Sequence, residues 1–263
     1  MNNIITFPNL GLEFNISRAM FTIGDFSVYW YGFIISCGLI LAVIYGYFEC
    51  KRIKFNTDDF FNMLIISIPV SIICARLYYV IFNFSLYKDN LLSIINIRNG
   101  GLAIYGGIIG AALVIFLYCK KKKINMGIVL DILAIGLLIG QAIGRWGNFV
   151  NGEAFGSVTA LPWAMSIKTD GATIAEMVHP TFLYESVWNL VGIFILLLLK
   201  KRKKFEGELF CDYMIWYGLG RFFIEGLRAD SLYIGEFRVS QVLSLLIFII
   251  AFIIILIKRS KNT

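Results

Sequence analysis

The sequence predicts an all-α integral membrane protein, a bundle of seven transmembrane helices, and three observations support this. First, the 263 residues are 59% hydrophobic and 16% charged, with a mean hydropathy of +0.77, whereas soluble domains are about half apolar and a quarter charged. Second, seven apolar segments are each long enough to cross a bilayer. Third, clusters of basic residues follow alternate segments. Together these features indicate that lipid surrounds most of the chain.

The seven apolar segments are the predicted elements. A span needs about 20 apolar residues, and it must be a helix because a helix satisfies its own backbone hydrogen bonds in hydrocarbon. The predicted spans are residues 28–49, 60–82, 101–119, 126–146, 181–199, 208–228 and 237–257.

The basic residues predict how the chain crosses the membrane. Clusters at 51–54, 120–123, 200–204 and 258–261 contain three, four, five and three of the 24 Lys and Arg residues. Each cluster follows an odd-numbered span, and cytoplasmic loops are the ones enriched in Lys and Arg. We therefore expect an extracytoplasmic N-terminus and a cytoplasmic C-terminus. The same placement explains the net charge of +7 without a nucleic-acid partner.

The sequence predicts a single membrane-embedded domain over residues 1–263, since no linker divides it. The longest loop, 147–180, follows the fourth span and is expected to form a small irregular head outside the cell. Five scattered cysteines and the single His179 predict no metal site, and no cofactor is expected.

Glycines mark two places of close packing. Gly136, Gly140 and Gly144 recur every fourth residue in the fourth predicted span, which places them on one helix face that another helix can approach closely. The pairs at 100–101 and 106–107 bracket the start of the third span and predict a bend or a close contact there.

Ionisable residues inside a bilayer are costly and are functional candidates by default. In the predicted topology, polar residues of six spans converge on the outer half of the membrane, and Asp131 is the exception nearer the inner side. The converging residues are Tyr31, Arg76, Tyr105, Arg145, Asn148, Glu153, His179, Glu185, Tyr217, Arg221, Glu225 and Arg228. Arginine matches phosphate in charge and geometry, so these residues predict a cavity for an anionic lipid headgroup.

The helical spacing distinguishes candidates that can pair within a helix from those that can bind an external anion. Arg221 and Glu225 are four residues apart and can pair within one helix, whereas Arg145 has no carboxylate one turn before it and is expected to meet an external anion. Arg76 has two open interpretations, a substrate role or a structural ion pair with Glu185 or Asp131.

Five segments resemble the prolipoprotein diacylglyceryl transferase family. The most specific is GRWGNFVNGEAFG at 144–156, and the others are WYG at 30–32, GGLAIYGG at 100–107, HPTFLYE at 179–185 and YGLGRFFIEGLR at 217–228. The resemblance implies transfer of a diacylglyceryl group from phosphatidylglycerol to the lipobox cysteine of a preprolipoprotein signal peptide, the first step of bacterial lipoprotein maturation. The implied location is the bacterial cytoplasmic membrane, with membrane lipids as further partners.

The resemblance also implies roles for residues of this chain. Arg145, Asn148, Glu153 and Arg221 fall on phosphatidylglycerol-binding positions, and Arg221 on an essential one. Supporting positions are expected at Tyr31, Arg76, Glu185, Tyr217, Glu225 and Arg228.

The proton acceptor for the attacking thiol is left open by the sequence. Tyr105 stands where some relatives carry histidine, and an ordinary tyrosine, with a pKa near 10, is a poor base at neutral pH. Tyr105, His179 and solvent all remain candidates, with Arg145 and Arg221 as the expected electrostatic catalysts.

Two other classes of function compete with a transferase. A transporter or channel would use the buried charges as a pathway but would need polar residues in both membrane halves. A non-catalytic lipid-binding protein would need fewer polar groups at one level. The acyl-chain preference, the modified proteins, the oligomeric state and the order of substrate binding do not follow from the sequence.

Overall fold

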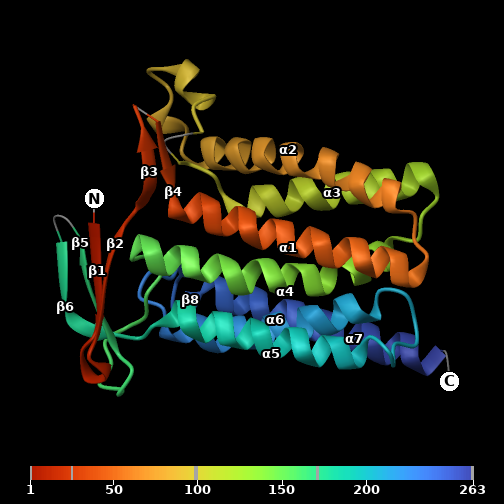
Figure 1. Ribbon diagram of the computed structural model, residues 1–263. Coiled ribbons are helices and arrows are strands. Elements are labelled where there is room, and N and C mark those ends of the chain that lie inside the picture. The colour runs from red at the N-terminus through yellow and green to blue at the C-terminus, as the bar shows by residue number, and fades with distance from the viewer. Residues whose placement is uncertain (1, 25, 98–99, 170–171, 262–263) are drawn as a thin grey trace. The chain divides into compact units, whose positions relative to one another are not determined.

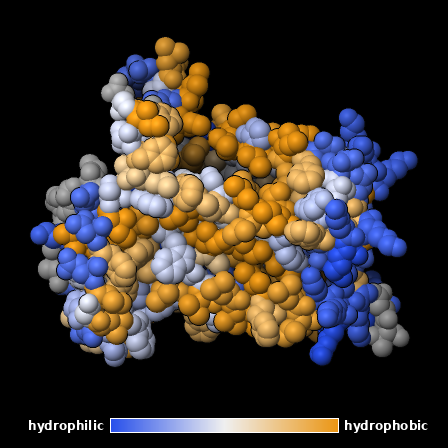
Figure 2. Space-filling model, in the orientation of Figure 1, coloured by the Kyte–Doolittle hydropathy of each residue, from blue (hydrophilic) through white to orange (hydrophobic). Residues whose placement is uncertain are grey.

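The computed structural model describes residues 2–24, 26–97, 100–169 and 172–261, and within them seven long α-helices form (Figure 1). They are α1 (Trp30–Ile53), α2 (Thr57–Phe82), α3 (Ile104–Lys122), α4 (Met126–Asn151), α5 (Thr181–Leu199), α6 (Glu208–Leu227) and α7 (Val239–Lys261). Six of these described helices are long and apolar enough to span a membrane; the other is α6, which carries Glu208, Asp212, Arg221 and Glu225. Figure 2 shows the apolar side chains that cover the helices. The protein is a multi-pass membrane protein, as predicted.

The helix bounds agree with the predicted spans to within a few residues, with one informative difference. Helix α4 continues to Asn151, five residues beyond the predicted end of the fourth span. Asn148 and Asn151 are therefore helical and not part of the following loop. The chain forms two compact units, residues 1–46 with 130–263 and residues 47–129.

The first unit contains a sheet that the sequence did not predict. Strands β1 (Asn2–Phe7), β2 (Leu12–Ser17), β5 (Met165–Thr169) and β6 (Ala172–Val178) pair antiparallel in the order β2-β1-β5-β6. Residues 147–180 were expected to form an irregular head, but 165–169 form a strand paired with the N-terminal β1, and 172–178 form a strand paired with 165–169. Ile5 and Ile167 pair across β1 and β5 and are fully buried, together with Phe149 of α4. The sheet is thus packed on the C-terminal end of α4.

Two short hairpins lead into helices of the same unit. Strands β3 (Ala19–Ile23) and β4 (Phe26–Tyr29) precede α1, and β7 (Tyr233–Ile234) and β8 (Phe237–Arg238) precede α7. Each hairpin therefore ends directly at the first residue of a spanning helix.

The glycine face of α4 packs on α1, as the spacing predicted. A Cβ added at Gly136 would lie 3.5 Å from the Ala42 carbonyl oxygen, and one added at Gly144 would lie 3.2 Å from Ile35 Cδ1. Backbones approach this closely only where small residues line the contact.

In the second unit, α2 and α3 pack closely at the second pair of glycines. A Cβ on Gly106 would clash with the Cys74 carbonyl oxygen and lie 2.5 Å from Tyr78 Cβ, and one on Gly110 would lie 2.8 Å from Cys74 Cβ. The 3-10 turns η2 (Phe84–Leu86) and η3 (Leu91–Ile94) lie in the connection between these helices. The predicted close contact at Gly106 is confirmed.

Helices α5 and α6 are joined by a reciprocal pair of tryptophans. The Trp188 and Trp216 rings stack with centroids 4.2 Å apart. Each indole nitrogen donates to the other residue's carbonyl oxygen, at 3.1 and 3.0 Å. The Trp188 ring lies over Gly220 and the Trp216 ring over Gly192, where a Cβ would clash with the indole. This pair sets the spacing of the two helices that carry Glu185, Arg221 and Glu225.

Replacement of Gly220 by alanine is expected to destabilise the protein by about 1–3 kcal/mol, because Trp188 is held by stacking and by hydrogen bonds and cannot move away without losing them. Gly140→Ala is the matched control, since a Cβ there meets nothing within 4 Å, and it should be neutral or stabilising by up to about 1 kcal/mol. Unfolding in detergent, followed by tryptophan fluorescence, measures both. Equal stability of the two variants would contradict the proposed role of the tryptophan pair.

Candidate functional site

Glu185 is the central residue of the charged site in the first unit. It lies one turn into α5, and its side chain is only 8% exposed. Its Oε2 is 2.6 Å from Arg145 Nη2 of α4, and its Oε1 is 2.9 Å from Arg221 Nη1 of α6. A single carboxylate therefore binds arginines from two other helices. Because buried charges need a partner, this contact allows both arginines to lie inside the bundle.

No carboxylate stands one turn before Arg145 in α4, but the structure supplies one from another helix. The sequence argument considered only its own helix, whereas Glu185 is supplied by α5. Among the described residues, Arg145 has two polar partners, Glu185 and the Asn148 side-chain oxygen at 3.1 Å from Nη1. A guanidinium has five N–H donors, so Arg145 retains donor capacity for a ligand, and its side chain is 24% exposed.

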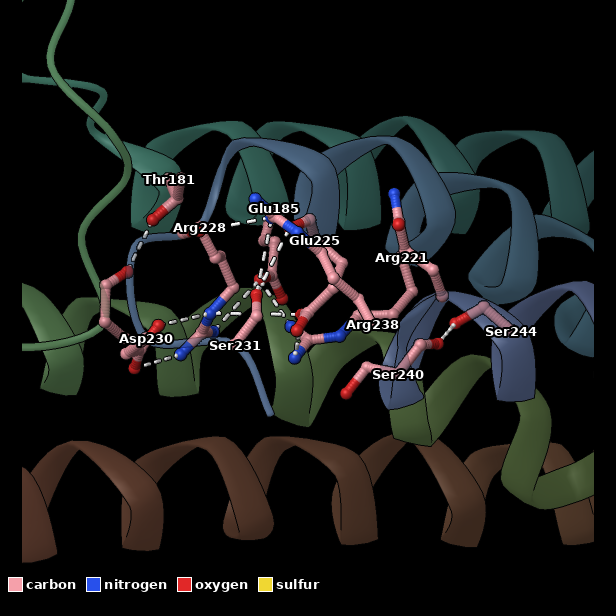
Figure 3. A network of polar contacts seen from close by, with 12 residues as sticks. Thr181, Glu185, Arg221, Glu225, Arg228, Asp230, Ser231, Arg238, Ser240 and Ser244 are labelled. Atoms are coloured by element: carbon pink, nitrogen blue, oxygen red, sulfur yellow. Dashed lines mark hydrogen bonds and ion pairs between the residues drawn. The ribbon is translucent and has the colours of Figure 1, made fainter. Parts of the chain in front are cut away.

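A row of charges continues along α6 beyond Glu185 (Figure 3). Arg221 Nη2 lies 2.6 Å from Glu225 Oε2, which confirms the predicted pair within the helix. Arg228, just after α6, lies 3.8 Å from the Glu185 carboxylate and 4.0 Å from that of Glu225. It also forms a bidentate ion pair with Asp230, in which Nε and Nη2 donate at 2.9 and 2.8 Å. The carboxylates of Glu185 and Glu225 thus bind a cluster of three arginines.

Arg238 binds the end of this cluster that contains Arg228. Its Nη1 donates to the Glu225 carbonyl oxygen and, at 3.1 Å, to the Arg228 carbonyl oxygen. It also lies 3.4 Å from the Ser231 hydroxyl, as Figure 3 shows. Arg238 is the last residue of β8, so the hairpin before α7 is bound to backbone carbonyl groups at the C-terminal end of α6 and just beyond it.

A second chain of polar contacts extends from Arg145 along the end of α4. The Asn148 amide donates to Glu153 Oε1 at 3.0 Å, and the Asn151 amide donates to the same oxygen at 3.3 Å. Arg18, between β2 and β3, donates to the Asn151 carbonyl oxygen at 3.1 Å. A cation there complements the negative end of the helix dipole. The predicted binding residues Arg145, Asn148 and Glu153 are therefore linked by consecutive hydrogen bonds.

His179 lies just before α5, outside the spanning segments, and is bound to Tyr184. Trp163 Nε1 donates to the Tyr184 hydroxyl at 2.7 Å, and His179 Nδ1 lies 3.2 Å from the same oxygen. Partial burial holds the pKa of His179 below its ordinary value, so the ring is neutral at pH 7. If the hydroxyl, which already accepts from Trp163, donates to Nδ1, the ring proton resides on Nε2. This arrangement favours His179 as a hydrogen-bond donor over a role as base.

The remaining predicted residues occupy three different environments. Tyr31, 37% exposed, packs on α4 between Arg145 and Asn148, since a Cβ at Gly147 would lie 2.8 Å from its ring. The Tyr217 ring stacks on Tyr213 with centroids 6.0 Å apart. Tyr105 is 38% exposed and belongs to the second unit, as does Arg76.

Arg76 is fully hydrogen-bonded inside its own unit, and Asp131 has partners in the other unit. The hydrogen bonds of Arg76 go to backbone carbonyl oxygens of its own unit. Asp131 accepts instead from Lys203 Nζ at 3.1 Å and from the backbone nitrogens of Gly207 and Phe210 at 2.9 and 3.1 Å. The one ionisable group expected nearer the inner side thus holds the start of α6, which weakens the case for a polar pathway across the membrane.

Sequence reasoning missed Arg18, Arg238 and the Trp163–Tyr184 pair. The two arginines carried a signal, because both lie outside the four basic clusters and on the side predicted to be poor in Lys and Arg. A basic residue on that side has a structural or functional reason to be there. The Trp163–Tyr184 contact had no such signal, since it depends on how the loop folds back on α5.

Glu185→Gln is expected to lower the free energy of unfolding by about 3–5 kcal/mol, because two buried arginines lose their shared carboxylate. Asp230→Asn is the matched control. Asp230 also pairs with an arginine but is 54% exposed, and loss of such a pair costs about 0–1 kcal/mol. Denaturant unfolding in detergent distinguishes the two. A Glu185→Gln protein as stable as Asp230→Asn would show that Glu185 does not support the cluster.

Comparisons with known proteins show the family of this chain. The family model described as prolipoprotein diacylglyceryl transferase matches residues 18–257. A relative from Clostridioides difficile, named phosphatidylglycerol–prolipoprotein diacylglyceryl transferase, is 48% identical over 94% of this chain and 98% of its own length. Relatives of the same name from Listeria monocytogenes and Limosilactobacillus reuteri are 46% identical over 91% and 43% identical over 97% of this chain, which covers 88% and 95% of them. The chain belongs to the prolipoprotein diacylglyceryl transferase family.

Proposed function

We propose that this protein transfers the diacylglyceryl group of phosphatidylglycerol to the thiol of a lipobox cysteine in a preprolipoprotein. The observation that carries the proposal is the Arg145–Glu185–Arg221 cluster, built from the segments that resemble the family and buried in a membrane bundle. The names of the relatives state the same reaction. The step would be the first in bacterial lipoprotein maturation.

The chemistry of the reaction explains why arginines are required. The thiolate attacks the glyceryl carbon that bears the phosphate ester, a C–S bond forms, and the C–O bond to phosphate breaks. The electron pair leaves with glycerol phosphate, and the thiol proton passes to a base or to solvent. Negative charge therefore develops on the departing phosphate, where fixed guanidinium groups stabilise it most.

We infer distinct parts for the two principal arginines from their partners and exposure. Arg145 is held by two partners, keeps donors for a phosphate and is more exposed than Arg221. Arg221 is held on both sides by Glu185 and Glu225. We infer that Arg145, with Asn148 and Glu153, binds the headgroup, while Arg221 supplies a fixed positive charge beside it. Glu185, Glu225 and Arg228 orient the pair, and Tyr31 and Tyr217 line the site.

The base is still open between Tyr105 and solvent, with His179 the least favoured. Thiolate is the nucleophilic form of cysteine, and positive charge lowers the pKa of a nearby thiol. The arginine cluster alone thus promotes ionisation of the incoming cysteine.

We further propose the bacterial cytoplasmic membrane as the location, with the site in its outer half. The substrates would reach it from the surrounding membrane lipids. The reaction requires no cofactor and no metal, and nucleic acid is not an expected partner.

The transfer reaction is tested with acyl-labelled phosphatidylglycerol and a synthetic lipobox peptide in detergent. Arg145→Ala and Arg221→Ala are each expected to lower kcat by about 10²–10³-fold, the typical loss on removing one electrostatic donor. Arg202→Ala, at an exposed basic position after α5, is the matched control and should retain full activity. Absence of label on the peptide cysteine with folded wild-type protein would refute the proposed reaction.

The proposed orientation is tested by cysteine labelling in whole cells after replacement of the five native cysteines. Glu13→Cys, in β2, is expected to react with a membrane-impermeant maleimide in intact cells, and Lys201→Cys only after permeabilisation. Both positions are exposed in the structure, so accessibility differs only by the side of the membrane. The reverse labelling pattern would invert the topology predicted from Lys and Arg.

A further inference from the structure

Ala154, in the connection between α4 and β5, has a backbone conformation that is unusual for a residue with a side chain. Its φ is +57°, and that of Gly152, two residues earlier, is +65°. Glycine adopts positive φ without strain, whereas a Cβ makes this conformation costly. Such a residue persists only where the surrounding structure holds it. The residue between these two is Glu153, whose side chain belongs to the candidate site.

The contact that holds Ala154 comes from Thr181, the first residue of α5. The Thr181 hydroxyl donates to the Ala154 carbonyl oxygen at 2.5 Å, and Thr181 is fully buried. Because a hydroxyl has a single donor, this contact commits the donor of Thr181 to Ala154. Thr181 stands four residues before Glu185, so both side chains lie on one face of α5 (Figure 3). The face of α5 that binds the arginines therefore also binds Ala154, one turn earlier.

Residues 152–157, which we call the strap, connect the ends of α4, α5 and α6. Three backbone nitrogens of the strap donate to carbonyl oxygens at or next to those helix ends. The pairs are Glu153 with Asn148 at 3.1 Å, Gly156 with His179 at 2.9 Å and Ser157 with Leu227 at 2.7 Å. A Cβ on Gly156 would lie 2.6 Å from His179 Cβ, so the strap has no room to shift there. Ala154 lies between these fixed points, and Thr181 binds it there.

The conformation of Ala154 bears directly on the Glu153 side chain. Glu153 Oε1 accepts from the Asn148 and Asn151 amides at 3.0 and 3.3 Å, and Asn148 in turn accepts from Arg145. A return of Ala154 to negative φ would turn the peptide group that joins it to Glu153, because the strap is held on both sides. The Glu153 carboxylate would then move away from the two amides.

We propose that Thr181 is a positioning residue for Glu153, which it places by holding Ala154 at positive φ. The inference rests on the proposed function, in which Glu153 binds the phosphatidylglycerol headgroup together with Arg145. Thr181 is fully buried and does not contact the substrate. Loss of its hydroxyl should raise KM for phosphatidylglycerol and change kcat little, because the ion pairs of the arginine cluster stay in place.

The test is the kinetics of transfer by Thr181→Val, Thr181→Ser and the double variant Thr181→Val with Ala154→Gly. Valine keeps the shape of threonine without the hydroxyl, and serine keeps the hydroxyl. We expect Thr181→Val to raise KM for phosphatidylglycerol by about 10-fold, with kcat within about 3-fold, because the strain at Ala154 is no longer opposed. Thr181→Ser should keep the wild-type KM. Glycine adopts positive φ freely, so the double variant should return to within about 3-fold of the wild-type KM.

Thr159→Val is the matched control and should leave KM and kcat unchanged. Its hydroxyl lies in the same connection and accepts from the Leu161 backbone nitrogen at 3.3 Å, outside the strap. The control separates the loss of the Thr181 contact from the loss of any threonine hydroxyl in this part of the chain.

A role of Thr181 in the packing of α5 alone predicts a different result. Thr181→Val would then be impaired to the same degree with alanine or glycine at position 154, and this outcome overturns the proposal, as does a wild-type KM in Thr181→Val. If Thr181→Val does not fold, Ala154→Val replaces it, since a β-branched side chain is strained at positive φ; a wild-type KM in that variant contradicts the proposal equally. Folded wild-type protein without activity would instead refute the proposed function itself, so the two failures are distinguishable.

Discussion

The cost of placing arginine inside a lipid-embedded bundle governs the architecture of the site. A guanidinium cannot shed its proton, so each buried arginine must be given acceptors by the protein. Glu185 satisfies this requirement for Arg145 and Arg221 at once, and Glu225 does so again for Arg221. Helices α4, α5 and α6 are thereby joined at one level. The same contact that stabilises the bundle also holds two positive charges where a phosphate can meet them.

The number of acceptors around each arginine distinguishes Arg145, the proposed binding group, from Arg76. Arg145 has a carboxylate and an amide as partners and is 24% exposed. Arg76 has five carbonyl partners and is 7% exposed. The two residues carry the same charge and lie at a similar depth in the predicted topology, yet only the first has donors left for a ligand. Hydrogen-bond capacity decides the difference, and charge alone does not.

The packing of the helices keeps these groups in register. The Trp188–Trp216 pair sets the distance between α5 and α6, and Asp131 caps the start of α6 with Gly207 and Phe210. Trp188 stands about one turn after Glu185 and its ring packs on Gly220, next to Arg221, whereas the Asp131 contact lies at the opposite end of α6. The two contacts fix the rotation and height of α6, on which Arg221 and Glu225 depend. A rigid scaffold of this kind is what electrostatic stabilisation of a leaving group requires, because the charges then need no rearrangement during the reaction.

The sequence by itself determined the seven spans, their bounds to within a few residues, the close packing at Gly106 and Gly136, and the residue types of the site. These features depend on local composition and helical periodicity, which a linear pattern records. Only the tertiary structure showed that Glu185 pairs with Arg145 and that Arg76 binds carbonyl groups. It also showed that residues 2–17 share a sheet with 165–169 and 172–178. Each of these pairings joins segments with no fixed spacing, so the partner is chosen by how the helices and loops meet in space and not by the pattern along the chain.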